Sequence, residues 1–125
     1  MKNFLHEGIC PIRDVISRFG DKWSLLVFVS LKNNGTMRFN EIQKSIGDIS
    51  QRMLTVTLRS LEADGYVNRT IYPEVPPRVE YCLSDLGRDL MPHLDSLIAW
   101  TLENKQKIMD SRKIGNSQNE QNKQM

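Results

Sequence analysis

The chain has few of the residues that carry catalytic or metal chemistry. Of its 125 residues only two are histidine and two are cysteine. His6 and His93 have no nucleophile or metal-ligating partner at a useful spacing, and no Cys-x-x-Cys, His-Glu-x-x-His, phosphate-loop or Gly-x-Ser-x-Gly motif is present. The clustered Cys and His ligands of a metal sensor are lacking as well. We therefore expect no enzyme, no cofactor and no bound metal.

Long hydrophobic runs are also missing. No stretch approaches the roughly 18 apolar residues of a membrane span. The N-terminus lacks a cationic region followed by an apolar run and a small-residue cleavage site. Both absences predict a cytoplasmic protein with no membrane partner. In a reducing compartment Cys10 and Cys82 are more typical of free thiols than of a disulfide.

The chain has no large excess of charge of either sign. Its formal net charge is +2, and between Arg38 and Arg78 six cations stand against five anions. Total charge therefore gives no support for nucleic-acid binding. Any such affinity has to come from the local placement of cations.

What the chain does have is an amphipathic helix that begins after Ser50, a good N-cap. Leu54, Leu58 and Leu61 recur at i, i+4 and i+7 as a core-facing stripe. Gly65 can take the left-handed conformation that ends a helix. The opposite face has no carboxylate and consists of Arg52, Thr55, Val56, Arg59 and Ala63. Such a face suits close approach to a phosphate-lined groove.

A β-hairpin is expected directly after this helix, with strands at residues 66–71 and 79–83. Pro73, Pro76 and Pro77 cannot donate to a β-ladder, which predicts a stiff, irregular tip. A helix that leads into such a hairpin is typical of a winged helix-turn-helix. It also occurs in α+β domains that bind no nucleic acid, so this pattern alone leaves both interpretations open.

The preceding segments complete a helix-turn-helix. We expect a helix from Pro11 to Phe19 and a mostly buried helix at residues 22–31 that Asp21 caps. A short strand at residues 36–38 and a short helix at residues 39–46 should follow. The predicted fold is α+β and mainly helical. It is a winged helix-turn-helix with a two- to three-stranded antiparallel wing and a long C-terminal dimerisation helix.

Ser84 is expected to cap that C-terminal helix, and Pro92 should bend it or remove one backbone hydrogen bond. Its stripe at helical spacing consists of Leu86, Leu90, Leu94, Leu97 and Thr101. This surface favours a homodimer formed through the long helix and the first helix, with simple packing on the core as the alternative. We predict one domain over residues 1–110 and a polar, disordered tail over residues 111–125.

Several strings of the chain match one protein family in order. They are Cys10-Pro11, Gly20-Asp21-Lys22-Trp23, Arg38 to Ile42, Ile49 to Leu54, Leu58 to Glu62, Asp64-Gly65, Val75 to Tyr81, Leu83-Ser84, Gly87 and Trp100. Over residues 9 to about 101 the chain resembles the HxlR-type transcriptional regulators, winged-helix proteins related to the MarR group. One departure is Asp21, where the family usually has glycine. The resemblance implies a homodimer, which we expect to act as a repressor. Its two Ser50 helices would enter successive major grooves of double-stranded DNA, in a pseudo-palindromic operator with half-sites about 34–36 Å apart.

Four residues of the Ser50 helix are predicted to read base edges: Gln51, Arg52, Thr55 and Arg59. Recognition helices present their N-terminal half to the bases. Arginine can bridge guanine with two hydrogen bonds, and glutamine can do the same for adenine.

Four further cations are predicted to meet the DNA backbone or a groove. Lys22, Arg38 and Lys44 are phosphate candidates near helix starts and the short strand. Arg78, just past the hairpin tip, is expected to reach the minor groove from the wing. The alternative for each phosphate candidate is an ordinary surface cation.

Cys10 is a candidate sensor. It lies at the expected N-cap of the first helix, where the helix dipole and free N–H groups favour a thiolate, and Arg13 and Lys22 add positive field. Several members of the resembled family use a cysteine before the proline as a redox or electrophile switch. We hypothesise an oxidant or other small-molecule effector acting there, with an inert residue as the alternative. Cys82 is expected to serve packing.

A second functional hypothesis comes from another class of protein. The fold could serve as a protein-interaction module that has no specific DNA binding and uses its wing or long helix for a partner. A steep loss of affinity with salt would separate the two, because it reports phosphate contacts.

Overall fold

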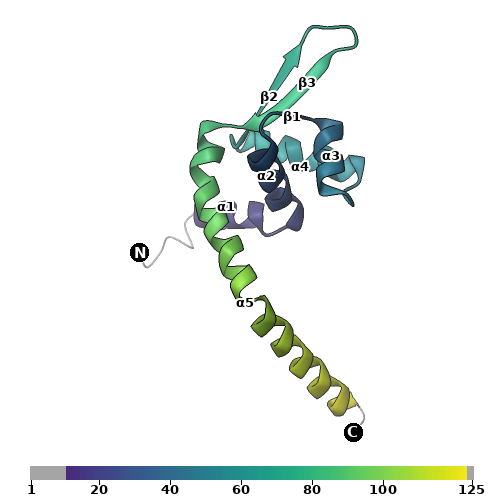
Figure 1. The fold of residues 1–125 in the computed structure, drawn as a ribbon, viewed down its shortest axis with the longest axis vertical. Helices are drawn as coiled ribbons and strands as arrows, with labels where there is room; N and C mark the ends of the chain where they lie inside the picture. Colours follow the sequence, from purple (N-terminus) through teal and green to yellow (C-terminus); the bar gives the residue numbers. More distant parts are fainter. Residues whose placement is uncertain (1–10, 124–125) are drawn as a thin grey trace. The chain divides into compact units, whose positions relative to one another are not determined.

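The computed structural model describes residues 11–123, which divide into two compact units meeting between Met91 and Pro92. The first unit confirms the predicted α+β, mainly helical class (Figure 1). Its elements are α1 (Pro11–Phe19), α2 (Lys22–Asn34), β1 (Met37–Arg38), α3 (Phe39–Ile46), α4 (Gln51–Ala63), β2 (Val67–Tyr72), β3 (Arg78–Leu83) and the first turns of α5 (Asp85–Lys123).

The expected helix caps are present because each depends on local sequence. Asp21 Oδ1 accepts a hydrogen bond from the Ser24 backbone N–H at 2.8 Å at the start of α2. Ser84 Oγ accepts from the Gly87 N–H at 3.1 Å at the start of α5. Each bond satisfies a backbone donor that has no partner within its helix.

The three strands form one antiparallel sheet in the order β1-β3-β2, as the predicted two- to three-stranded wing allows. The register places Val67 opposite Leu83 at the base of the hairpin and Tyr72 opposite Arg78 near its tip. Figure 1 shows the β2–β3 hairpin projecting from the helices. β2 begins one residue later than predicted, at Val67, because the Tyr66 backbone N–H donates to the Leu61 carbonyl at the end of α4 and does not join the ladder.

The core is built around α2, as predicted, although α2 is less completely buried than expected. Val27 and Phe28 are fully buried, but Leu26 is 40 % exposed. α2 also ends three residues later than predicted, at Asn34. The other side chains that are at most 2 % exposed include Leu31, Ile42, Leu54, Leu58, Leu61 and Val67. The apolar stripe of α4 therefore packs in the core.

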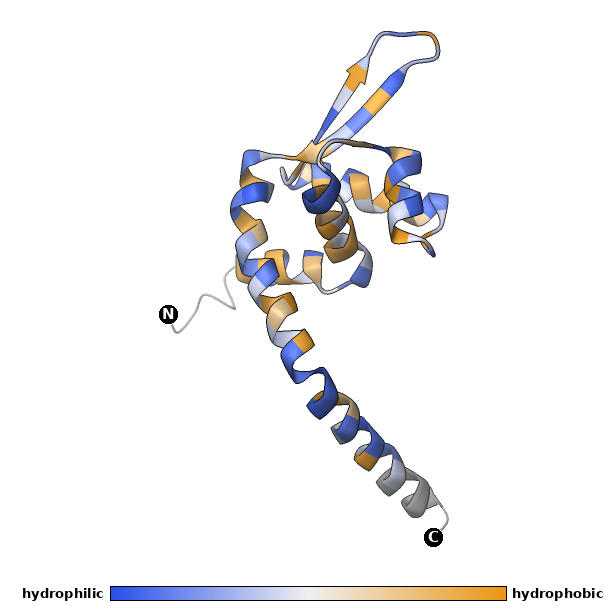
Figure 2. Cartoon of the chain, in the orientation of Figure 1, coloured by the Kyte–Doolittle hydropathy of each residue, from blue (hydrophilic) through white to orange (hydrophobic). Residues whose placement is uncertain are grey.

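The second unit is the remainder of α5, which continues through Pro92 to Lys123. α5 covers residues 111–123, where the sequence predicted a disordered tail, and residues 124–125 lie outside the described part. Continuing an existing helix adds about one hydrogen bond per residue without a new nucleation cost, and this segment contains no proline. Figure 2 shows how strongly polar residues prevail in the C-terminal half of α5. None of the helices described here combines the length and apolar character needed to cross a membrane.

Candidate nucleic-acid interface

α3 and α4 are joined by a tight turn that makes them a helix-turn-helix. Gly47 ends α3 with φ 97°, a conformation that favours glycine, and its N–H donates to the Gln43 carbonyl at 2.9 Å. The Gln43 side-chain amide donates to the Ile49 carbonyl at 3.3 Å, and the Ile49 side chain is buried. The turn is thus closed by hydrogen bonds and anchored in the core, which holds the start of α4 in place.

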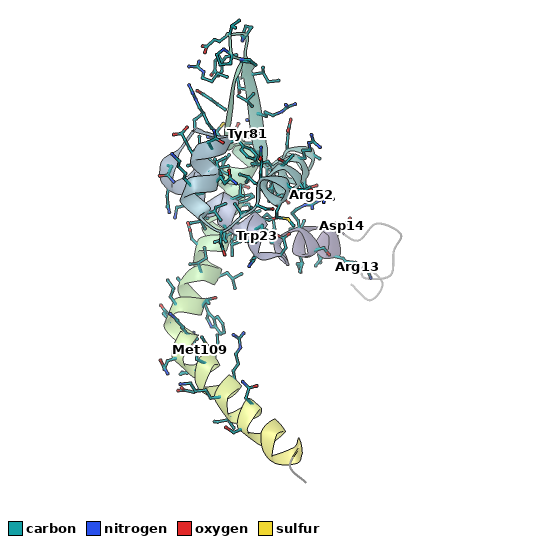
Figure 3. The ribbon with its side chains drawn as sticks, turned by 90° about the vertical axis from the view of Figure 1, so that its right-hand side faces the viewer. Arg13, Asp14, Trp23, Arg52, Tyr81 and Met109 are labelled. Atoms are coloured by element: carbon teal, nitrogen blue, oxygen red, sulfur yellow. The ribbon has the colours of Figure 1, made fainter. Side chains whose placement is uncertain are left out.

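α4 has the two faces that the sequence predicts. Ser50 Oγ accepts from the Met53 N–H at 3.1 Å, which caps the helix. Arg52 and Arg59 are exposed, and Val56 between them is 51 % exposed. Figure 3 labels Arg52 on this helix. The exposed face therefore presents two guanidiniums separated by a small apolar side chain.

The other two predicted base readers, Gln51 and Thr55, differ in exposure and in hydrogen bonding within the helix. Gln51 is exposed in the first turn of α4. Thr55 is half-buried, and its hydroxyl donates to the Gln51 backbone carbonyl at 2.9 Å. The Thr55 oxygen can still accept a hydrogen bond, but its proton is already used within the helix. The base-reading roles of all four α4 residues stay predictions.

The arginines of α4 differ from those of the hairpin in that the hairpin arginines form ion pairs. Among the side chains that the structure describes, no carboxylate lies within ion-pair distance of Arg52 or Arg59. Arg69 of β2, by contrast, pairs with Glu62 of α4 at 3.3 Å between Nε and Oε2. Within the described part of the chain, the cations of the α4 face therefore have no ion-pair partner.

The Arg78 side chain near the wing tip is held by contacts with three other side chains. Its guanidinium lies 3.4 Å from carboxylate oxygens of both Glu74 and Glu80, and 4.1 Å from the centroid of the Tyr72 ring. The hairpin register explains this arrangement, because Tyr72 is the cross-strand partner of Arg78. Insertion into a minor groove would have to release these contacts, so that role stays a prediction.

The three phosphate candidates lie on three different elements. Lys22, at the first position of α2, holds its Nζ 4.3 Å from the centroid of the Trp23 ring, which Figure 3 labels. Arg38 is exposed before α3, where its backbone N–H donates to Glu41 Oε1 at 2.9 Å. Lys44 is exposed in the last turn of α3. Phosphate contact by these cations stays a prediction.

A polar cluster that the sequence does not predict lies where α4 meets the sheet. Arg69 lies opposite Tyr81 in the register, and Arg59, Glu62 and Tyr81 line the same hollow beside it. Burial raises the pKa of the Tyr81 hydroxyl, an effect that the positive charge of Arg69 partly opposes. No local sequence signal could have found this cluster, because it depends on how the hairpin packs against the helix.

Only one of the two cysteines lies in the part of the chain that the structure describes. Cys10 lies outside the described residues, although α1 does begin at Pro11 as predicted. Cys82 is a free, half-buried thiol on β3, paired across the ladder with Asn68.

A capped helix with an unneutralised cationic face, preceded by a short helix and followed by a projecting hairpin, defines a winged helix-turn-helix domain. Comparison with known proteins agrees. The profile of the HxlR-like helix-turn-helix family matches residues 18–109. The chain belongs to this family, which consists of transcriptional regulators and not of enzymes.

Individual relatives support the same assignment. The chain is 50 % identical over 94 residues to an uncharacterized HTH-type transcriptional regulator of Methanothermobacter thermautotrophicus, covering 75 % of this chain and 71 % of that protein. The redox regulator HypR in its reduced form superposes with a TM-score of 0.71 at 39 % identity, covering 80 % of this chain and 98 % of that one. Diamide-treated YodB from Bacillus subtilis superposes with a TM-score of 0.66 at 34 % identity, covering 78 % and 96 %. Redox regulators are thus among the structural relatives of this chain.

Proposed function

We propose that this regulator binds double-stranded DNA sequence-specifically as a homodimer and acts as a repressor. α4 enters the major groove, and the β2–β3 hairpin serves as the wing. The observation that carries the proposal is the exposed face of α4, where Arg52 and Arg59 have no carboxylate partner among the described residues. An unneutralised guanidinium is available both to phosphates and to the O6 and N7 atoms of guanine.

The apolar residues of α1 and α5 support the dimer. On α1, Ile12 is 47 % exposed and Ile16 is 65 % exposed. On α5, Leu97 and Trp100 are more than half exposed, and Figure 2 shows apolar residues recurring along this helix. Exposed apolar residues on both helices are expected where a second copy packs.

The operator follows from two-fold symmetry. A dimer that presents two copies of α4 needs a pseudo-palindrome with half-sites about 34–36 Å apart. The test is to select bound fragments from the organism's own promoter DNA and to sequence them. The proposal expects enrichment of one inverted repeat with that spacing. Enrichment of no common sequence would contradict specific binding and favour the protein-interaction module.

The proposed signal is oxidation or electrophilic modification of Cys10. Cys10 directly precedes the first residue of α1, a position where the helix dipole favours a thiolate. The likeness to the redox regulator HypR and to diamide-treated YodB supports this assignment. Modification is proposed to release the repressor from its operator.

Cys10→Ser tests the sensor directly. We expect the variant to bind the selected operator as the wild type does but to stay bound when diamide is added. Cys82→Ser is the matched control and should respond to diamide like the wild type. The measurement is fluorescence anisotropy of labelled operator with and without diamide. An unchanged diamide response in Cys10→Ser would rule out Cys10 as the sensor.

A further inference from the structure

The recognition helix and the wing share a very short connection. α4 ends at Ala63 and β2 begins at Val67, so only residues 64–66, called here the α4–β2 joint, lie between them. Gly65 has φ 86°, and its N–H donates to the Glu62 carbonyl at 3.0 Å. The Tyr66 N–H donates to the Leu61 carbonyl at 3.0 Å. Because the joint is only three residues long and its backbone is hydrogen-bonded to α4, a displacement of the joint moves α4 and the wing together.

α1 holds the joint through an ion pair and a ring contact. The Arg18 guanidinium forms a two-pronged pair with the Asp64 carboxylate, through Nε to Oδ2 and through Nη2 to Oδ1 at 3.3 Å. The hydrogen bond to Asp64 raises the pKa of Arg18. One residue further along, the Phe19 ring lies 5.5 Å from the Tyr66 ring, between centroids. The two contacts fix α1 to both ends of the joint.

α5 holds the same joint through its first turn. The Ser84 hydroxyl donates to the Gly65 carbonyl, and the Ser84 backbone N–H donates to the Tyr66 carbonyl at 2.9 Å. Gly87 packs so closely that an added Cβ would collide with the Tyr66 carbonyl oxygen. Because that atom belongs to the backbone, it cannot swing aside as a flexible side chain could. Only glycine therefore allows this approach.

We propose that the α4–β2 joint is where α1 and α5 set the position of both DNA-reading elements, with Arg18 and Gly87 as positioning residues. The inference rests on the proposed function, in which α1 and α5 also carry the dimer interface. Residues 64–66 receive contacts from both of these helices. The separation of the two α4 helices in a dimer then depends on these contacts, and so does the half-site spacing that the dimer prefers.

Gly87→Ala is the first test, with Gly115→Ala as its matched control. Both glycines lie within α5, but an added Cβ at Gly115 meets nothing within 4 Å. The probes are the selected operator, versions of it with one base pair added or removed at the centre, and a random duplex of equal length. Gly87→Ala should lose about tenfold on the selected operator, keep its affinity for the random duplex and shift its preferred spacing. Gly115→Ala should match the wild type.

Arg18→Gln and Asp64→Asn form a second test of the role of the joint. This test remains decisive even if circular dichroism shows that Gly87→Ala is unfolded. Each single variant should bind the selected operator about threefold to tenfold more weakly, and the double variant no more weakly than the weaker single one. Folded variants with wild-type operator affinity and spacing preference would overturn the role of the joint alone. A wild type that prefers no operator would instead overturn the proposed function, and the joint proposal with it.

Discussion

At the scale of single residues, pairing within the chain decides which cations remain for DNA. Arg52 and Arg59 have no carboxylate partner among the described residues, whereas Arg69 pairs with Glu62. Arg78 is held by two carboxylates and a ring. Charge totals hide this difference, because they count every arginine equally.

Arg59→Ala should weaken binding to the selected operator far more than binding to a random duplex. A guanidinium with two hydrogen bonds to guanine contributes about 1–3 kcal/mol of discrimination, which is roughly a 5- to 150-fold loss. Arg112→Ala removes an exposed arginine from α5 and serves as the control, with no loss expected. Competition titrations measure the ratio of the affinity for the operator to the affinity for the random duplex. Equal losses on both would leave Arg59 as a phosphate contact and remove it as a base reader.

Residue-level features were predictable where they depend on neighbours in sequence. The caps at Asp21, Ser50 and Ser84 were expected, since each involves a backbone N–H three residues ahead. The pair between Arg18 and Asp64 joins positions 46 apart, and only the packing of α1 against the end of α4 creates it. No spacing rule in the sequence leads to such a contact.

At the scale of elements, periodicity made α4 the most predictable part of the chain. Its buried stripe, exposed face and end at Gly65 all agree with the sequence. Element boundaries were less predictable, since β2 starts one residue later than expected. The sequence predicted disorder where α5 continues to Lys123, because low hydrophobicity argues against a packed core but not against the continuation of a helix already formed.

Leu58→Ala should destabilise the first unit by about 2–5 kcal/mol, because it opens a cavity beneath α4. Leu58 is 2 % exposed. Val56→Ala, two residues away on the 51 % exposed face, should change stability by less than about 0.5 kcal/mol. Urea unfolding followed by circular dichroism gives both values. Similar midpoints for the two variants would contradict the assignment of faces on α4.

At the scale of the whole molecule, binding to the proposed operator requires a second copy of the chain. A single α4 helix reads one half-site, whereas a pseudo-palindromic operator needs two. Leu97 of α5 belongs to the stripe expected to meet the partner, and it is 56 % exposed in one chain. Leu102 is 68 % exposed and lies about 140° further around the same helix.

Leu97→Glu should therefore dissociate the dimer, because it introduces a charge into an apolar contact. Leu102→Glu makes the same chemical change on a different face and should leave the dimer intact. Light scattering coupled to size-exclusion chromatography distinguishes about 14.5 kDa from twice that mass. A monomeric wild type would contradict the dimer, and dissociation by Leu102→Glu alone would place the interface on another face of α5.

The most direct test of the central claim, specific DNA binding through α4 and the wing, is the salt dependence of affinity for the selected operator and for a random duplex. A dimer with about six or more phosphate contacts should lose roughly a thousandfold in operator affinity between about 50 and 200 mM salt. At physiological salt it should still prefer the operator by about a thousandfold or more. A weak affinity that is flat with salt and equal for the two duplexes would contradict the claim and leave the protein-interaction module as the better account.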